Sequence, residues 1–244
     1  MIATIARLTF RALAGRRRSL LVTLLGGLPI LLALFVLVSG RSSNLDAISA
    51  TILDRLVIST LVPLVGLVFG TAALGSELDD GTAVYLLTKP IARWRIVAAK
   101  VVVAAGMAIA VTAPAGFAAA AILGSGASGL LAAIGYTAGA AVAAILYVAV
   151  FMALSLVTGR ALAIGLVYIL VWEGVLAGLF EGTRTFSIRQ YALGVADAIA
   201  GGDGAASGER LAGQTAITLA VVVLVFALLI AVRRLQTYEI GEAD

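Results

Sequence analysis

The stretch "SELDDGTAVYLLTKPIARWR", residues 76–95, decides how this sequence folds, because it separates two long apolar runs. The run before it, 56–75, has no charged residue, and the run after it, 96–123, has only Lys100. Between them the chain places six charges, with the acids first: Glu77, Asp79, Asp80, Lys89, Arg93 and Arg95. A polar interruption between two runs that are each long enough to cross a bilayer indicates a loop between two spans.

The composition of the whole chain supports a helical membrane protein. Of the 244 residues, 62% are hydrophobic and only 12% are charged, whereas a soluble domain usually carries about 25% charged residues. A helix needs about 20 apolar residues to cross the hydrocarbon core of a bilayer. We therefore predict an all-α, polytopic membrane protein with six transmembrane helices, at 19–39, 56–75, 96–123, 130–157, 161–180 and 211–232.

The positions of the basic residues predict how these spans are oriented. With the N-terminus inside, the cytoplasmic segments hold most of the 17 bases, namely Arg7, Arg11, Arg16, Arg17, Arg18, Lys89, Arg93, Arg95, Lys100, Arg160, Arg233 and Arg234. The outer segments hold Arg41, Arg55, Arg184, Arg189 and Arg210. This positive-inside bias places both termini, including the tail 233–244, in the cytoplasm, and makes 181–210 an outer helical loop.

Abundant arginine, alanine and glycine are typical of a GC-rich bacterial genome, so we expect a multi-pass protein of the bacterial plasma membrane.

Residues 1–18 form a separate cytoplasmic segment before the first span. At 100° per residue, the apolar residues of "IATIARLTFRAL" fall on one side, and Arg7 and Arg11 fall on the other. This pattern predicts an amphipathic helix that lies at the membrane surface. The alternative is a frayed basic tail that only sets the topology.

Three spans contain a G-x-x-x-G spacing, which permits close approach of two helices in a membrane. The pairs are Gly66/Gly70, Gly135/Gly139 and Gly174/Gly178. Such spacings also arise by chance in glycine-rich spans.

Several classes of function are excluded by missing residues. The chain has no cysteine and no histidine, which rules out disulfides, zinc–histidine sites and a serine–histidine dyad. It contains no G-x-x-x-x-G-K-[ST] motif, so it does not bind ATP through a P-loop. We therefore predict no catalytic residue, no metal site, no cofactor bound by this chain and no nucleic-acid partner.

Glu173, in "YILVWEGVLAGLFEG", is the one carboxylate well inside an apolar run. A charge at this depth costs several kcal/mol and is expected to face the bundle, a watery cavity or a partner subunit. Three roles stay open: a structural hydrogen-bonded group near the outer interface, a group in the transport pathway or its gate, and a proton-coupling group.

The polar stretch 76–95 is expected to form a short helix between the second and third spans. Glu77, Asp79 and Asp80 suit the first turn of a helix, where acids favour the helix dipole. Pro90 ends that helix, because the residue before a proline avoids the helical conformation. The exposed apolar residues ringed by charge fit a docking surface, or the stretch is a loop that only sets the topology.

The same stretch resembles the loop between the second and third spans of permeases of the ABC-two class, the type V ATP-binding-cassette exporters. Their loop reads E-x-x-x-G-T, then L-L-[ST]-[KR]-P, then R-W, and this chain matches with Glu77, Gly81, Thr82, Leu86, Leu87, Thr88, Lys89, Pro90, Arg93 and Trp94. The six-span plan and the basic N-terminal helix extend the resemblance over nearly the whole chain.

The resemblance implies that 76–95 is a coupling helix seated in a separate ATPase subunit, which supplies ATP and Mg²⁺. Two permease chains, expected to form a homodimer, and two ATPase chains would make the exporter. The residues implied at the ATPase contact are Glu77, Asp79, Asp80, Gly81, Tyr85, Leu86, Arg93 and Arg95. Two alternatives need no such motor: a secondary transporter or channel with Glu173 as its coupling carboxylate, and a membrane anchor that recruits a cytoplasmic protein.

Overall fold

All secondary-structure elements in the described part of this protein are helices. The computed structural model describes residues 2–39, 45–79, 92–124, 126–176, 181–201 and 210–237. The α-helices are α1 (Ile2–Leu13), α2 (Arg16–Val38), α3 (Leu45–Thr51), α4 (Val62–Asp79), α6 (Arg93–Leu123), α7 (Gly126–Val157), α8 (Ala161–Val167), α10 (Ile188–Ala200) and α11 (Gly213–Gln236). Two π-helical segments, η2 (Ile52–Leu61) and η3 (Tyr168–Leu176), and a 3₁₀ helix, η4 (Glu181–Phe186), complete the described part. The predicted all-α polytopic class is confirmed.

The described residues contain five helices that are long and apolar enough to cross a membrane. They cover Leu21–Val38, Ile48–Gly75, Arg93–Leu123, Gly129–Val157 and Gly213–Gln236. The predicted span 161–180 appears instead as a shorter apolar helix, Ala161–Leu176, and 177–180 lie outside the described residues. The count thus differs from the six predicted spans, because the described part of the fifth is shorter than a full crossing.

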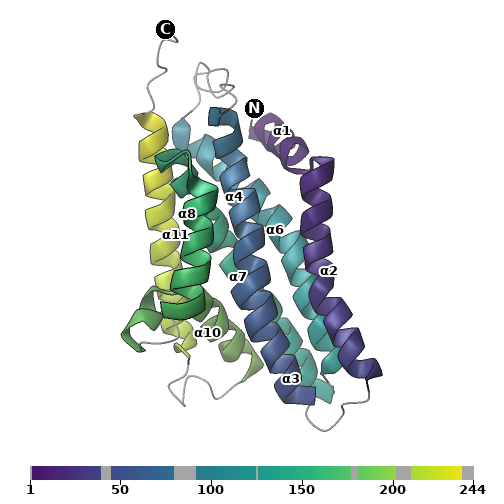
Figure 1. Ribbon diagram of the computed structural model, residues 1–244. Coiled ribbons are helices and arrows are strands. Elements are labelled where there is room, and N and C mark those ends of the chain that lie inside the picture. The colour runs from purple at the N-terminus through teal and green to yellow at the C-terminus, as the bar shows by residue number, and fades with distance from the viewer. Residues whose placement is uncertain are drawn as a thin grey trace.

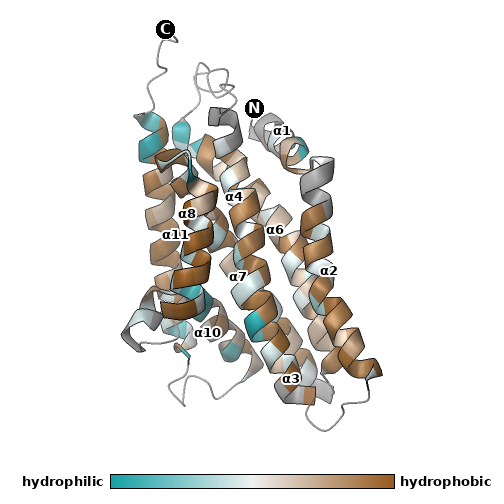
Figure 2. Cartoon of the chain, in the orientation of Figure 1, coloured by the Kyte–Doolittle hydropathy of each residue, from teal (hydrophilic) through white to brown (hydrophobic). Residues whose placement is uncertain are grey.

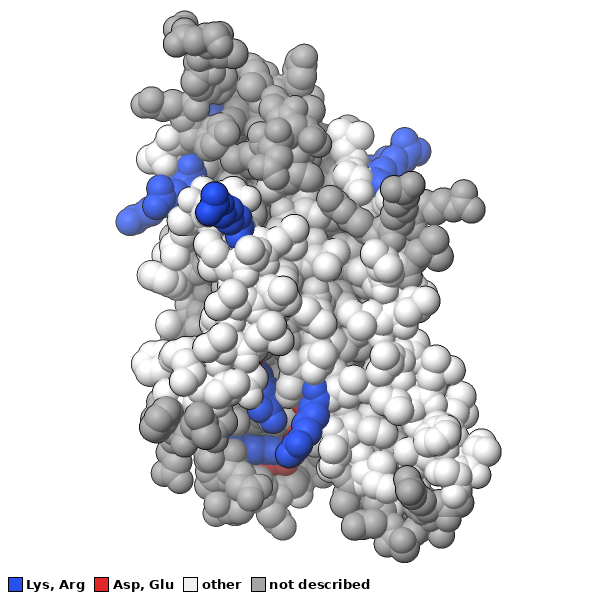
Figure 3. Space-filling model, viewed as in Figure 1, with Lys and Arg blue, Asp and Glu red and all other residues white. Residues whose placement is uncertain are grey.

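Different helices lie at the two ends of the bundle. Helix α1 and the end of α11 lie at one end, and α3 and α10 lie at the other (Figure 1). Hydrophobic residues run along α2, α8 and α11, and hydrophilic residues gather towards the ends (Figure 2). On the face shown in Figure 3, lysines and arginines leave a belt of uncharged residues between the ends. This arrangement fits the predicted orientation, in which α1 and the end of α11 share the cytoplasmic side.

The N-terminal helix is confirmed as α1. Thr9 and Leu13 are buried against the bundle, whereas Arg7 and Arg11 are exposed. Leu8 and Phe10 are also more than half exposed, so the outer face of α1 combines two cations with two large apolar side chains. That combination suits a helix lying at a lipid surface.

Helix α7 occupies the centre of the bundle, and glycines let two neighbours approach it closely. A Cβ atom on Gly70 would lie 2.9 Å from the Val148 carbonyl oxygen of α7, and one on Gly66 would clash with Tyr147. Gly135 and Gly139 of α7 meet the backbone of α10 in the same way. The first two G-x-x-x-G pairs therefore lie at tight interfaces. Gly174 approaches no other element within 4 Å, and Gly178 lies outside the described residues.

Replacing Gly139 with alanine is expected to push α10 away from α7, because the added methyl would meet the Ala192 carbonyl oxygen. Overpacking of this kind costs about 1–3 kcal/mol. The loss of stability is measured as a decrease in the thermal unfolding midpoint of the purified protein in detergent. Gly106→Ala is the matched control, because a Cβ atom there has no neighbour within 4 Å. An equal midpoint for both variants would contradict the tight contact.

Helices α3, η2 and α4 form one continuous helical stretch from Leu45 to Asp79. Its π-helical part ends at Leu61, and the N–H of the next residue, Val62, donates to the Val57 carbonyl, five residues back. The hydroxyls of Ser59 and Thr60 also bond to carbonyls five residues back. Pro63 follows Val62 and has no N–H to donate. The series of backbone hydrogen bonds loses a donor there, and the π-helical turns end at this point.

Candidate functional site

The predicted coupling stretch lies largely outside the described residues. Glu77 and Asp79 are part of α4, whereas Asp80, Gly81, Tyr85 and Leu86 fall in the gap 80–91. The expected placement of the acids in the first turn of a separate helix is therefore wrong for Glu77 and Asp79, which lie in the last turn of α4. The physical reason is that Glu77 and Leu78 favour helix, so α4 continues into the polar stretch.

The basic end of the stretch opens α6. Helix α6 begins at Arg93, and the Arg95 guanidinium lies 5.4 Å from the centroid of the Trp94 ring. The side chains of Trp94 and Arg95 are exposed. Cations at a helix N-terminus oppose the helix dipole, so helix stability does not explain their position.

Lys100, which the sequence analysis counted among the cytoplasmic bases, is not an exposed residue. Its side chain is only 1% exposed, and its Nζ donates a hydrogen bond of 2.7 Å to the Ala73 carbonyl oxygen of α4. Lysine reaches such a site because its apolar stem packs against neighbouring side chains. The bond joins α4 and α6 on either side of the coupling stretch, so the two helices that flank it are tied together.

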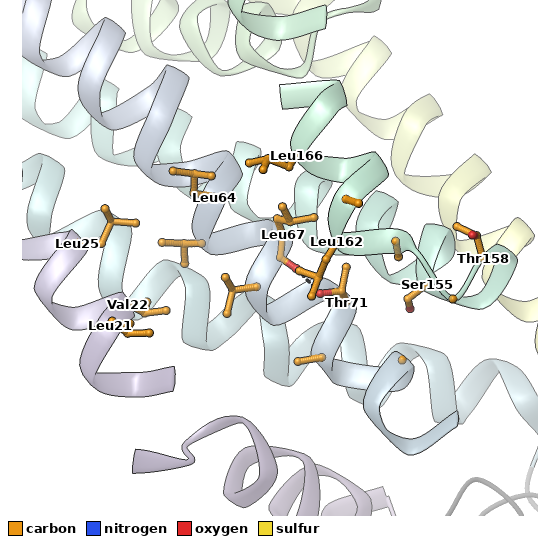
Figure 4. Close-up of a pocket in the computed structure, with 17 residues that line it drawn as sticks. Leu21, Val22, Leu25, Leu64, Leu67, Thr71, Ser155, Thr158, Leu162 and Leu166 are labelled. Atoms are coloured by element: carbon orange, nitrogen blue, oxygen red, sulfur yellow. Dashed lines mark hydrogen bonds between the residues drawn. The ribbon is translucent and has the colours of Figure 1, made fainter. Parts of the chain in front are cut away.

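An apolar cavity of about 740 Å³ opens beside α4, with α2 on one side and α8 on the other. Figure 4 shows Leu21 and Leu25 of α2, Leu64 and Leu67 of α4, and Leu162 among the side chains that line it. Sequence analysis did not find this cavity, because its walls come from segments more than a hundred residues apart.

The few hydroxyls in the cavity wall are already hydrogen-bonded. Thr71 donates to the Leu67 carbonyl of its own helix, and Ser155 donates to the Met152 carbonyl. The Thr158 hydroxyl accepts from the Arg160 N–H. Since these hydroxyls already have hydrogen-bond partners within the chain, the cavity presents an essentially apolar surface. Such a surface suits an apolar ligand rather than an ion.

Glu173 is buried, with 1% of its surface exposed, and accepts three hydrogen bonds. Its Oε1 accepts from the Tyr168 hydroxyl at 3.1 Å and from the Ile188 N–H at 2.9 Å, and its Oε2 accepts from the Ser187 hydroxyl at 2.5 Å. Ser187 is itself the N-cap of α10 and accepts from the Gln190 N–H. A carboxylate at a helix N-terminus satisfies free N–H groups and favours the dipole.

These bonds give Glu173 a structural role that fixes η3 to α10. They support the first of the three roles left open by the sequence, and a role in transport stays a prediction. Nearby, the Tyr191 hydroxyl donates to the Thr185 carbonyl at 2.5 Å. Burial, and secondarily the Glu173 carboxylate, raises the pKa of Tyr191 above its usual value, so this hydroxyl keeps its proton.

A second polar cluster joins four segments at the same end of the bundle. Arg210 pairs with Asp54 of η2 at 2.8 Å and with Asp197 of α10 at 2.9 Å, and also donates to the Tyr136 hydroxyl of α7 at 3.2 Å. Burial alone would lower the pKa of Arg210, but Tyr136, Asp54 and Asp197 outweigh it and raise that pKa, so the guanidinium stays charged.

The two clusters hold α10 at both of its ends. Glu173 binds the first turn of α10, and Arg210 binds Asp197 near its last turn. Both carboxylates that bring α10 to the spans, Glu173 and Asp54, lie in the π-helical segments η3 and η2. π-helical turns inside helices are frequent at functional sites. At this end of the bundle, two polar clusters therefore hold the short helix α10 against the longer helices.

Comparison with known proteins identifies the chain at the level of a family. The model of a family described as ABC-2 family transporter protein matches residues 5–237, which include most of α1, every candidate span and the polar stretch 76–95. A search of curated proteins finds no match. The chain belongs to the ABC-2 family of transporter proteins, as a membrane permease subunit of an ABC transporter.

Proposed function

We propose that this chain is the permease of an exporter that uses ATP hydrolysed by a separate ATPase subunit docked on residues 76–95. Two ATPase chains, which bind ATP and Mg²⁺, and two permease chains would make the complete transporter, with the permeases as a homodimer. The residues proposed at the docking surface are those of the coupling stretch: Glu77, Asp79, Asp80, Gly81, Tyr85, Leu86, Arg93 and Arg95.

The continuous helix from Leu45 to Asp79 is the observation that carries this proposal. It holds Glu77 and Asp79 at one end, the wall of the apolar cavity in its middle, and Asp54 of the Arg210 cluster near its other end. A push on the end that bears the acids would therefore reach both the cavity and the fastening of α10. The Lys100 bond to Ala73 would make α6 move with α4.

The apolar cavity supports the dimer as well. Large apolar side chains are exposed on both helices that border it, including Leu24 and Leu31 on α2 and Leu162 and Val167 on α8. A second copy packed against this face would cover them and enclose the cavity between the two chains. The substrate would then cross in an apolar compartment.

Reversing the charges of Glu77 and Arg93 together is expected to uncouple ATP hydrolysis from transport, because like charges would meet across the docking surface. The permease is reconstituted in vesicles with its partner ATP-binding-cassette ATPase. Transport per ATP hydrolysed should fall at least about tenfold, which corresponds to about 1.4 kcal/mol. Arg160→Glu, a charge reversal outside the coupling stretch, is the control. Unchanged coupling in the double variant would reject the docking assignment.

A further inference from the structure

A second cavity lies where α7 and α11 reach the end of the bundle that carries α1. It has a volume of about 480 Å³ and is lined by Val157, Ile230, Arg233, Arg234 and Thr237. It shares no lining residue with the cavity beside α4. Two arginines in the wall of a cavity at a helix end form a site that the exporter cycle proposed above does not use.

The guanidinium groups of these arginines are available for a ligand. The Thr237 hydroxyl lies 3.2 Å from both the Arg233 and the Arg234 carbonyl oxygens, and the Thr237 N–H also donates to the Arg233 carbonyl. The end of α11 is thus capped by Thr237, so the arginines are not needed for that task. Among the described residues, neither arginine forms an ion pair with a carboxylate.

An apolar stripe runs along α11 towards the arginines. Ile217, Val221, Val225 and Leu229 follow one another at four-residue spacing, and each is about half exposed. Arg233 is the next position of the same stripe. From Ile217 to Leu229 the stripe extends about 18 Å at the rise of an α-helix, which matches the depth of roughly one leaflet, about 15 Å.

We propose that this cavity binds the headgroup of an anionic phospholipid from the cytoplasmic leaflet, whose acyl chains lie along the apolar stripe of α11. The two guanidiniums would pair with the phosphate, since arginine forms bidentate hydrogen bonds to phosphate oxygens. An acidic protein surface could reach the arginines, but the stripe continues below the membrane surface, where the occupant is hydrocarbon. A zwitterionic lipid would bring its own cation towards both arginines and bind less well.

The test uses the full chain in nanodiscs of phosphatidylcholine that contain a set fraction of phosphatidylglycerol. Retained lipid is counted by native mass spectrometry after transfer to detergent. If each arginine that contacts the bound phosphate contributes about 1 kcal/mol, it gives about a fivefold preference for anionic lipid. Arg234→Gln should therefore reduce retained phosphatidylglycerol about fivefold, and Arg233→Gln with Arg234→Gln about 25-fold.

Arg160→Gln is the matched control. This exposed arginine lies at the N-cap of α8 and does not line the cavity, so its loss should change retention less than twofold. Inorganic phosphate, the headgroup anion without acyl chains, should fail to displace the lipid. Equal losses for Arg160→Gln and Arg234→Gln, no preference for phosphatidylglycerol in the unaltered chain, or full displacement by inorganic phosphate would each overturn the proposal. Equal thermal midpoints for all variants show that the fold is intact.

Discussion

Replacing Glu173 with alanine lowers the free energy of unfolding by about 3 kcal/mol, if the bonds at the start of α10 stabilise the fold. The change leaves the Ser187 hydroxyl, the Ile188 N–H and the Tyr168 hydroxyl without their acceptor. A buried donor without a partner costs about 1–3 kcal/mol, offset here in part because the charge of Glu173 is no longer buried. Unfolding in mixed micelles measures the loss, and Trp172 beside the site provides a fluorescence signal.

Glu173→Gln separates the structural role from a role in transport. The glutamine oxygen still accepts one hydrogen bond, so the variant should assemble and lose less stability than Glu173→Ala. Altered transport in a variant that is stably assembled would support Glu173 as part of the pathway or gate. Normal transport, together with the stability loss in Glu173→Ala, would leave it as a structural group alone. An unfolding midpoint for Glu173→Ala equal to that of the unaltered chain would contradict the capping role.

Arg210→Met is expected to cost about 3 kcal/mol, because it leaves the carboxylates of Asp54 and Asp197 without their cation. Breaking a buried ion pair by removing one partner costs about 3–5 kcal/mol, and the side chain of Arg210 is 19% exposed, which places the loss at the low end. Thermal unfolding of the purified chain measures it.

Two further variants make the Arg210 prediction specific. Arg55→Met removes an exposed arginine next to Asp54 in η2 and should change the midpoint little. Adding Asp54→Asn and Asp197→Asn to Arg210→Met removes both unpaired charges and should restore most of the stability. If Arg55→Met costs as much as Arg210→Met, or if the triple variant recovers nothing, the ion-pair cluster does not fasten α10.

The sequence predicted the features that depend on local patterns. Apolar runs of 20 residues are a strong local signal, and the amphipathic spacing of 2–13 is local too, so five of the six predicted spans and α1 could be found. The G-x-x-x-G pairs at Gly66/Gly70 and Gly135/Gly139 also proved to lie at helix contacts. The third pair did not show such a contact at Gly174, because spacing alone does not say which face of a helix has a neighbour.

The sequence did not predict features that depend on distant partners. Arg210 was assigned only to the outer surface, and its partner Asp54 lies 156 residues away along the chain. Lys100 was counted only among the cytoplasmic bases, because nothing in its local sequence indicates that it reaches the Ala73 carbonyl. The cavity beside α4 needs α2, α4 and α8 in place at once. These are tertiary properties, and a single sequence carries no direct signal of them.

Cross-linking at residue 85 tests the central claim most directly, namely that a separate ATPase grips the stretch between the second and third spans. The chain has no cysteine, so Tyr85→Cys provides one defined attachment point for a thiol-linked photo-cross-linker. Phe186→Cys is the control, because Phe186 is exposed and lies two residues before α10 in the chain. The account predicts a cross-link from residue 85 to the ATPase and none from residue 186. The account would be contradicted if residue 85 forms no cross-link to the ATPase in the assembled transporter. It would also be contradicted if the cysteine introduced at residue 85 reacts with a membrane-impermeant thiol reagent that is added outside the cell.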